Sequence, residues 1–151
     1  MCHFVYIWYI TMIETIDGLC DFAKSRGYTN ADRDLLKQAY VIANEYSNGK
    51  TRYRKPSRPF ITHLISVSAI LMTAGANIET VVAGLLHSVK NDMPRIYALN
   101  QTVGEIVENY FDNSVGPIEI TSFQNLSLIK SAVISIQMAN TADMILAKEL
   151  A

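Results

Sequence analysis

Apolar residues recur at every third or fourth position along most of this chain, and this spacing limits its fold more than any other feature. Within residues 12–26, for example, Ile13, Ile16, Leu19 and Ala23 fall on one side of a helix. Such a period predicts amphipathic α-helices, whereas the alternation typical of a half-buried strand is weak throughout. Counted with their N-caps, the expected helices cover residues 12–26, 30–47, 60–73, 77–87, 102–111 and 125–146.

Residues that cap or break helices mark the expected helix ends. Asn30, Asn77 and Thr102 are expected N-caps because their side-chain oxygens can accept a hydrogen bond from an amide of the first turn. Glu105 lies three residues after Thr102, and the two residues predict a capping box. Residues 90–101 are polar and contain a proline, which predicts a loop or a short helix.

The composition is that of one compact globular domain. The chain has 151 residues, of which 50% are hydrophobic and 18% charged, and this excludes a disordered or collagen-like protein. We therefore expect a single all-α domain over residues 1–151, a compact multi-helix bundle in which the largely apolar helix 60–73 is buried. The net charge of −1 provides no field that favours nucleic acid or an anionic membrane, so neither is an expected partner.

The N-terminal residues 2–13 are almost wholly apolar and aromatic. This run is shorter than the roughly 20 residues of a transmembrane helix, and it lacks the basic region and cleavage site of a signal peptide. We expect residues 1–11 to form an extension that packs on the core; translation from Met12 would also open a helix. Cys2 and Cys20 form neither a metal-binding pair nor a disulfide framework, so the expected location is the reducing cytoplasm.

Three polar residues within apolar helical segments are candidates for chemistry: His63, His87 and Asp143. A histidine on an apolar face is more often a hydrogen-bonded core residue than a ligand, and a single aspartate can lie on a solvated stripe. Two neutral imidazoles and one carboxylate are nevertheless sufficient ligands for Mn²⁺, Fe²⁺ or Zn²⁺. Residue types alone leave both interpretations open.

The loop over residues 49–59 concentrates positive charge. It carries Lys50, Arg52, Arg54, Lys55 and Arg58. Such a cluster is either a solvated charged loop or a phosphate clamp, since arginine binds phosphate oxygens in a bidentate manner and lysine adds a point charge.

Four segments occur in an order that is more specific than any single residue. The run RKPSRPFITHLISVSAIL (54–71) is similar to R-K-S-G-E-P-Y-I-x-H-P-L-x-V-A-x-I-L, and residues 76–92 to a helix that ends in H-D-x-x-E-D. Residues 102–115 resemble T-x-E-E-I-x-x-x-F-G-x-x-V, and NTADM (140–144) resembles K-L-A-D-R. The patterns that these segments resemble are those of the HD-type (p)ppGpp hydrolase family, the hydrolase domain of RelA/SpoT enzymes. The resemblance covers about residues 30–146.

That resemblance implies an α-helical bundle that holds one Mn²⁺ and removes pyrophosphate from the 3′ position of guanosine 3′,5′-bis(diphosphate), ppGpp. The residues that it assigns to metal binding are His63, His87 and Asp143. The expected ligand-binding residues are Arg52, Arg54, Lys55 and Ser88.

The chain departs from the family pattern at positions that carry the chemistry. Ser88 stands where the family has a ligand aspartate, and a hydroxyl is a poor replacement for an anionic ligand. Asn91 replaces the catalytic glutamate and cannot take a proton, so Asp92 is the acidic residue left of that catalytic pair. Ala147 replaces an asparagine. The catalytic positions to consider are therefore Asp92 and Asn91, and Mn²⁺ binding is expected to be weakened or lost.

Two functions follow from these departures. The first is a degenerate domain that binds a nucleotide, a phosphorylated small molecule or a protein and hydrolyses ppGpp weakly or not at all. The alternative is an active metal-dependent phosphohydrolase of altered specificity, with Asp92 as its acid and base. The loss of two carboxylates favours the first.

The last helix predicts how the domain assembles. Ile134, Met138 and Ile145 are expected to face away from the bundle, and a large exposed apolar patch is unusual on a soluble monomer. We therefore expect a homo-oligomer whose interface includes the N-terminal aromatic segment or the last helix.

Overall fold

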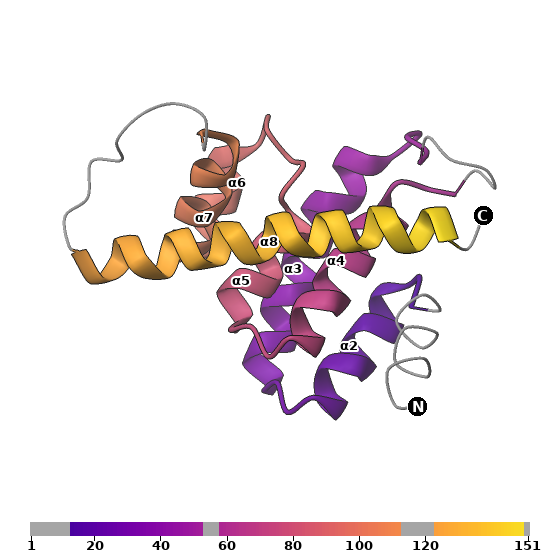
Figure 1. The fold of residues 1–151 in the computed structure, drawn as a ribbon, viewed down its shortest axis with the longest axis horizontal. Coiled ribbons are helices and arrows are strands. Elements are labelled where there is room, and N and C mark those ends of the chain that lie inside the picture. The colour runs from indigo at the N-terminus through magenta and orange to yellow at the C-terminus, as the bar shows by residue number, and fades with distance from the viewer. Residues whose placement is uncertain (1–12, 53–57, 113–122, 150–151) are drawn as a thin grey trace.

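A computed structural model describes residues 13–52, 58–112 and 123–149, the last helix being described by its backbone alone at residues 123–126 and 147–149. This part of the chain contains seven α-helices and no β-strand, so the prediction of an all-α fold is confirmed (Figure 1). The helices are α2 (Ile16–Ser25), α3 (Asn30–Ser47), α4 (Ile61–Thr73), α5 (Ile78–Leu85), α6 (Met93–Leu99), α7 (Gln101–Asp112) and α8 (Phe123–Glu149).

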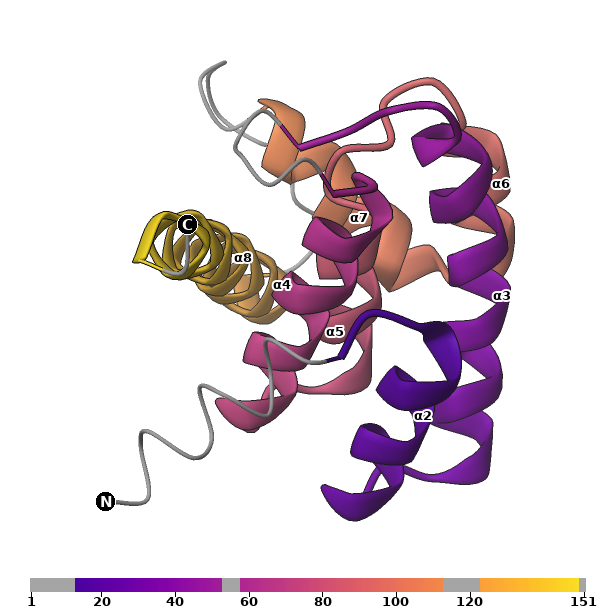
Figure 2. The same ribbon diagram turned by 90° about the vertical axis from the view of Figure 1, so that its right-hand side faces the viewer.

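The helices pack around a central pair, α4 and α5. The long helix α8 contacts both members of the pair on one side, and α3 contacts them on the other (Figure 2). Helices α6 and α7 pack against each other at one end of the bundle, and α2 packs against α3 and α4 (Figure 1). Polar residues on the facing sides of α4 and α8, or next to the end of α5, can therefore meet.

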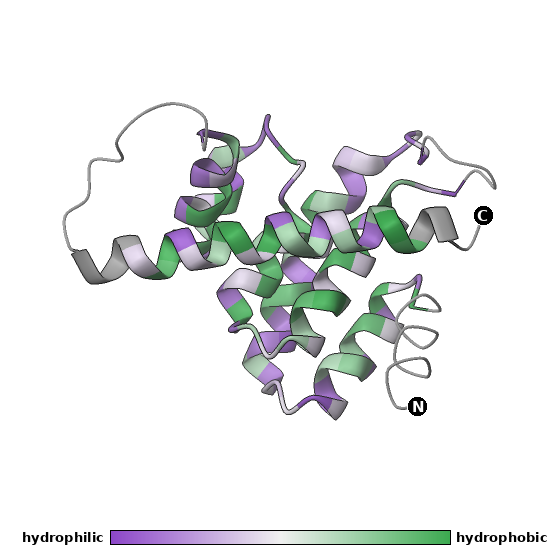
Figure 3. Ribbon diagram, in the orientation of Figure 1, coloured by the Kyte–Doolittle hydropathy of each residue, from purple (hydrophilic) through white to green (hydrophobic). Residues whose placement is uncertain are grey.

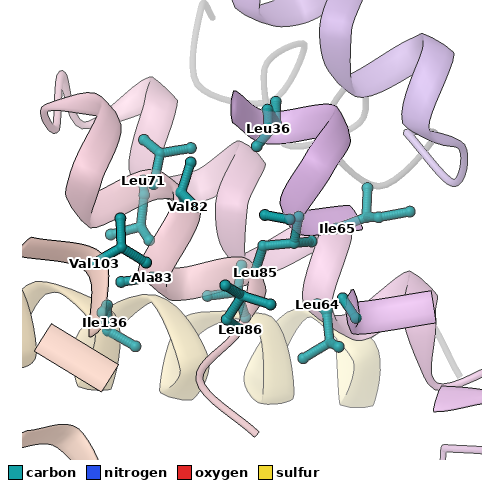
Figure 4. Close-up of a cluster of buried hydrophobic side chains, with 14 of the residues drawn as sticks. Leu36, Leu64, Ile65, Leu71, Val82, Ala83, Leu85, Leu86, Val103 and Ile136 are labelled. Atoms are coloured by element: carbon teal, nitrogen blue, oxygen red, sulfur yellow. The ribbon is translucent and has the colours of Figure 1, made fainter. Parts of the chain in front are cut away.

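The hydrophobic core is centred on α4. Ten of the 13 residues of α4 are buried, which confirms the prediction for the apolar segment 60–73. Leu64 and Ile65 from this helix, Leu85 from α5, Leu36 from α3 and Ile136 from α8 meet in one cluster (Figure 4). Each large aliphatic side chain that leaves water in this way contributes about 1.5–3 kcal/mol. The packing of α4 is therefore the main reason why the residues at its N-terminal end hold their positions.

The second helix begins one residue earlier than expected, because Thr29 and not Asn30 is its N-cap. The Thr29 hydroxyl accepts a hydrogen bond from the Asp32 amide at 3.1 Å, and the Asp32 carboxylate accepts one from the Thr29 amide at 3.0 Å. This reciprocal capping box needs an acidic residue three positions after the cap. Asp32 is that acidic residue for Thr29, and this is why Thr29 and not Asn30 caps the helix.

The caps of α5 and α7 show one correct and one wrong prediction. Asn77 caps α5 as expected, with its Oδ1 accepting a hydrogen bond from the Thr80 amide at 2.9 Å. Thr102 lies inside α7, and Asn100 caps this helix by accepting from the Val103 amide at 3.0 Å. Asparagine is a better N-cap than threonine, and α6 ends at this asparagine. The polar stretch 90–101 contains a short helix, α6, with a proline in its first turn.

Gly104 makes the close contact between α6 and α7 possible. A Cβ atom at this position would lie 2.4 Å from the ring of Tyr97. We expect Gly104→Ala to lower the free energy of unfolding by about 1–2 kcal/mol, because overpacking costs about 1–3 kcal/mol and exceeds the helix propensity that alanine gains. Urea unfolding would measure this. The exposed Thr102→Ala on the same helix should be neutral or stabilising, and an equal stability gain in both variants would contradict the contact.

One face of α8 presents apolar side chains away from the bundle. Ile134, Met138 and Ile145 are each more than half exposed, as expected from the sequence. Figure 3 shows hydrophobic residues recurring along α8, with polar residues between them. The N-terminal aromatic segment lies outside the described residues, so the homo-oligomer stays a prediction. None of the helices in the described part of the chain combines the length and the apolar character needed to span a bilayer.

Candidate functional site

The structure brings together the three polar residues that the sequence places on separate segments. His63 is in the first turn of α4, His87 is in the turn that follows α5, and Asp143 is on the buried side of α8. All three side chains are buried. The His63 Nδ1 lies 2.6 Å from Asp143 Oδ2, and the rings of His63 and His87 meet edge to face with centroids 5.3 Å apart.

His87 lies beyond the end of its helix, because α5 ends at Leu85 and not at His87 as expected. Its Nδ1 is 2.6 Å from the carbonyl oxygen of Gly84, which can only accept, so Nδ1 carries the proton and Nε2 keeps its lone pair. Burial lowers the pKa of His87 to about 4, and the nearby His63 acts in the same direction. Hydrogen bonds to Gly84 and Asn140 and the charge of Asp143 oppose this shift. His87 is therefore neutral at pH 7.

Arg52 joins His63 and Asp143 from the cationic loop. Its Nη2 donates to Asp143 Oδ2 and lies 3.3 Å from His63 Nδ1. His63 Nδ1 cannot both donate to the Asp143 carboxylate and accept from the Arg52 guanidinium. Its distance to Asp143 Oδ2, 2.6 Å, is the shorter of the two and indicates that His63 Nδ1 donates to Asp143. Asp143 is thus the shared acceptor of a guanidinium and an imidazole.

Backbone hydrogen bonds hold the loop that carries Arg52. The Phe60 amide donates to the Lys50 carbonyl at 3.0 Å, and the Arg52 amide donates to the Arg58 carbonyl at 2.8 Å. These bonds tie the two described ends of the loop together immediately before α4. Consequently Arg52 and His63 approach the same carboxylate although they belong to different segments.

A pocket of about 670 Å³ opens beside the two histidines. It combines cationic, aromatic and small polar side chains. Its lining residues are Tyr46, Lys50, Thr51, Phe60, His63, His87, Ser88, Lys90, Tyr110, Phe111 and Asn140.

The cations of this pocket lie against its aromatic wall. The Lys50 ammonium is 3.3 Å from the centre of the Tyr46 ring, and the Lys90 ammonium is 5.2 Å from the centre of the Phe111 ring. Tyr110 contacts His87 edge to face at 5.4 Å. A ligand that carries both an aromatic group and negative charge matches this lining.

The remaining predicted site residues lie in different places. Ser88 lines the pocket. Asn91 is exposed, and Asp92 accepts a hydrogen bond from Arg95 at 2.9 Å; neither lines the pocket. Arg54 and Lys55, and the side chain of Ala147, lie outside the described residues.

Several pocket residues were not singled out from the sequence. Asn140 lies three residues before Asp143 on α8, which places the two on one side of the helix, and its side chain bonds that of His87. That spacing in the sequence could have identified Asn140 as a site residue. Nothing in the sequence indicates that Tyr110 and Lys90 belong to the pocket, because an aromatic residue on a helix and a lysine in a turn are ordinary surface features.

The donor set does not fit a divalent metal ion as it is arranged. Two imidazole Nε2 atoms are suitable donors, but Oδ2 of Asp143 is engaged by both Arg52 and His63, and Ser88 offers a hydroxyl in place of an anion. Within the described ranges, no group of three or more His, Cys, Asp or Glu side chains is suited to hold a metal. The resemblance to a manganese site therefore stops at two histidines.

Comparison with known proteins gives partial matches of moderate identity. No family model matches the chain. It is 37% identical over 78 residues, 48% of its length, to the bifunctional (p)ppGpp synthase/hydrolase SpoT of Escherichia coli. It is 36% identical over 76 residues, 50% of its length, to a guanosine-3′,5′-bis(diphosphate) 3′-pyrophosphohydrolase of Vibrio cholerae. A third match, 35% identical over 65 residues and 43% of the chain, is the bifunctional (p)ppGpp synthase/hydrolase RelA of Mycobacterium tuberculosis.

These matches cover only a small part of the other proteins. The matched segments are 11%, 10% and 8% of the lengths of the three relatives, so the chain spans about a tenth of the curated proteins that it matches. Together with the all-helical fold, these similarities over about half of the chain support a relationship to RelA/SpoT-type proteins.

Proposed function

We propose that this domain binds a phosphorylated nucleotide in the pocket beside His63 and His87 and hydrolyses ppGpp weakly or not at all. The observation that carries the proposal is the pairing of two lysines with aromatic rings in one pocket. Aromatic faces accept a nucleobase by stacking, at about 1–3 kcal/mol per base, while ammonium groups attract phosphate. The relatives whose names include ppGpp chemistry support a nucleotide of this class.

Weak hydrolysis is proposed because the groups that would activate water are altered. The Asn91 side-chain amide neither gains nor loses a proton near neutral pH, and Asp92 lies outside the pocket lining in an ion pair with Arg95. Positioned acid–base catalysis contributes about 10²–10⁴-fold to a rate. A domain without it retains its binding groups but not this part of its catalysis.

Titration calorimetry with ppGpp, followed by chromatography of the mixture, tests both parts of the proposal. We expect saturable binding with turnover on the order of 10²-fold or more below that of a complete site. Lys50→Ala and Lys90→Ala should each weaken binding about tenfold or more, because a hydrogen bond to a charged group contributes about 1.5–3 kcal/mol. The exposed Lys37→Ala on α3 is the matched control and should bind normally. Absence of binding to ppGpp, GDP and pyrophosphate would refute the proposal.

An active metal-dependent phosphohydrolase of altered specificity is the second candidate. The geometry of His87 favours it, because metal-ligating histidines generally donate their second N–H to a carbonyl or carboxylate, as His87 does to Gly84. In this case Mn²⁺ would be the cofactor and Asp92 the acid and base. Release of phosphate or pyrophosphate from a panel of nucleotides, only with added Mn²⁺, would establish this candidate over the first.

A further inference from the structure

The charge balance around His63 and His87 differs from that of a divalent metal site. The family resemblance implies two carboxylates and two neutral imidazoles, whose two negative charges offset the metal. Here Ser88 removes one of these charges, and the Arg52 guanidinium offsets the remaining one on Asp143. The charges of Arg52 and Asp143 therefore already offset each other, and a divalent ion would add two positive charges without compensation in a buried place.

Geometry supports the same conclusion independently of charge counting. The Arg52 side chain is only 16% exposed, and that of Asp143 is 6% exposed, so the pair is largely shielded from water. The Arg52 Nη2 atom is also 3.3 Å from His63 Nδ1, which puts the guanidinium directly against a residue expected to bind metal. The backbone hydrogen bonds of Arg52 with Arg58 and of Phe60 with Lys50 hold the arginine there.

We infer that the Arg52 guanidinium takes the electrostatic place of the divalent ion, so that this HD-like site works as a metal-free site with a built-in cation. The inference goes beyond the proposed nucleotide binding, because it concerns the metal and holds whichever anion the pocket accepts. It also assigns Arg52 a positioning role, since the guanidinium fixes the carboxylate to which His63 donates. Restoring the missing ligand carboxylate alone is then insufficient to restore metal binding.

Calorimetry with Mn²⁺ or Zn²⁺ on chelator-stripped protein tests this inference through four proteins. Wild type, Ser88→Asp and the matched double variant Arg58→Gln/Ser88→Asp should bind the ion weakly. Arg58 is the control because it belongs to the same loop but pairs with the exposed Glu14 at 2.8 Å. Arg52→Gln/Ser88→Asp should bind at least about tenfold more tightly than Ser88→Asp, in line with the 10–100-fold effects of groups around a metal site. Equal affinities of these two variants would overturn the inference.

A measurement on the unaltered protein covers the case in which the Arg52 variant does not fold. Mn²⁺ broadens the NMR signals of any imidazole that it ligates. With millimolar Mn²⁺ we expect the ring signals of His63 and His87 to stay sharp, while broadening of both by less than one equivalent would overturn the inference. Binding of ppGpp, GDP and pyrophosphate, each measured with and without EDTA, separates the two proposals. Loss of binding in EDTA contradicts the metal-free site, and no binding of any of the three in either condition contradicts the proposed function alone.

Discussion

Replacing Asp143 with alanine is expected to lower the free energy of unfolding by about 3–5 kcal/mol, the typical cost of breaking a buried ion pair by removing one partner. The variant leaves the guanidinium of Arg52 largely buried without its anion, and it removes the acceptor of His63. Urea unfolding at pH 7 measures the loss. Thr141→Ala, an exposed change on the same helix, should alter stability far less.

A double variant separates the lost ion pair from damage to the helix. Arg52→Met/Asp143→Leu removes both charges together, and replacement of a buried pair by apolar side chains is often neutral. We expect it to recover most of the stability that Asp143→Ala loses. If the double variant were as unstable as the sum of two single changes, the pair would have no coupling and the contact would have little energetic weight.

Acidification is expected to destabilise the domain by roughly 3 kcal/mol through His87 alone, between about pH 6.5 and pH 4. Burial lowers the pKa of His87 to about 4 in the folded state, from about 6.5 in the unfolded chain. In this interval the unfolded chain binds a proton that the folded chain does not. Stability from this group is therefore complete above pH 6.5 and is lost as the pH falls through the folded pKa.

Chemical unfolding at several pH values would isolate this contribution. His87→Gln removes the titrating group, so the difference in unfolding free energy between wild type and variant should shrink by roughly 3 kcal/mol from pH 7 to pH 4. Titration of other groups cancels in that difference. A difference that is constant with pH would show that His87 is protonated equally in the folded and unfolded chains.

The fold could be predicted from the sequence much more completely than the site. Helical periodicity is local, so the sequence shows each helix within about four turns. The errors fall at helix ends: the caps Thr29 and Asn100, the start of α2 at Ile16 and the end of α5 at Leu85. The meeting of His63, His87 and Asp143 could be predicted from the order of segments. Whether they bind a metal or a ligand stays a prediction.

The contact of Arg52 with Asp143 could not be predicted. The two residues are 91 positions apart. The loop contains five cationic residues, and the sequence does not show which of them pairs with Asp143. The aromatic wall of the pocket could not be predicted either, because it also combines residues that are distant in the sequence. Tyr46 and Tyr110 come from different helices, and their common surface exists only after α3 and α7 have packed on the central pair.

The aromatic contacts around His87 form a continuous series of rings. His63, His87, Tyr110 and Phe111 follow one another with centroids 5.3, 5.4 and 5.8 Å apart, each pair meeting edge to face. In such pairs the protons at the edge of one ring lie within the ring current of the next. The chemical shifts of these four rings are therefore linked, and a molecule that tilts any one of them on entering the pocket changes the spectrum of its neighbours. Binding of a ligand in the pocket can therefore be followed through the aromatic signals of the one-dimensional proton NMR spectrum, without an added probe.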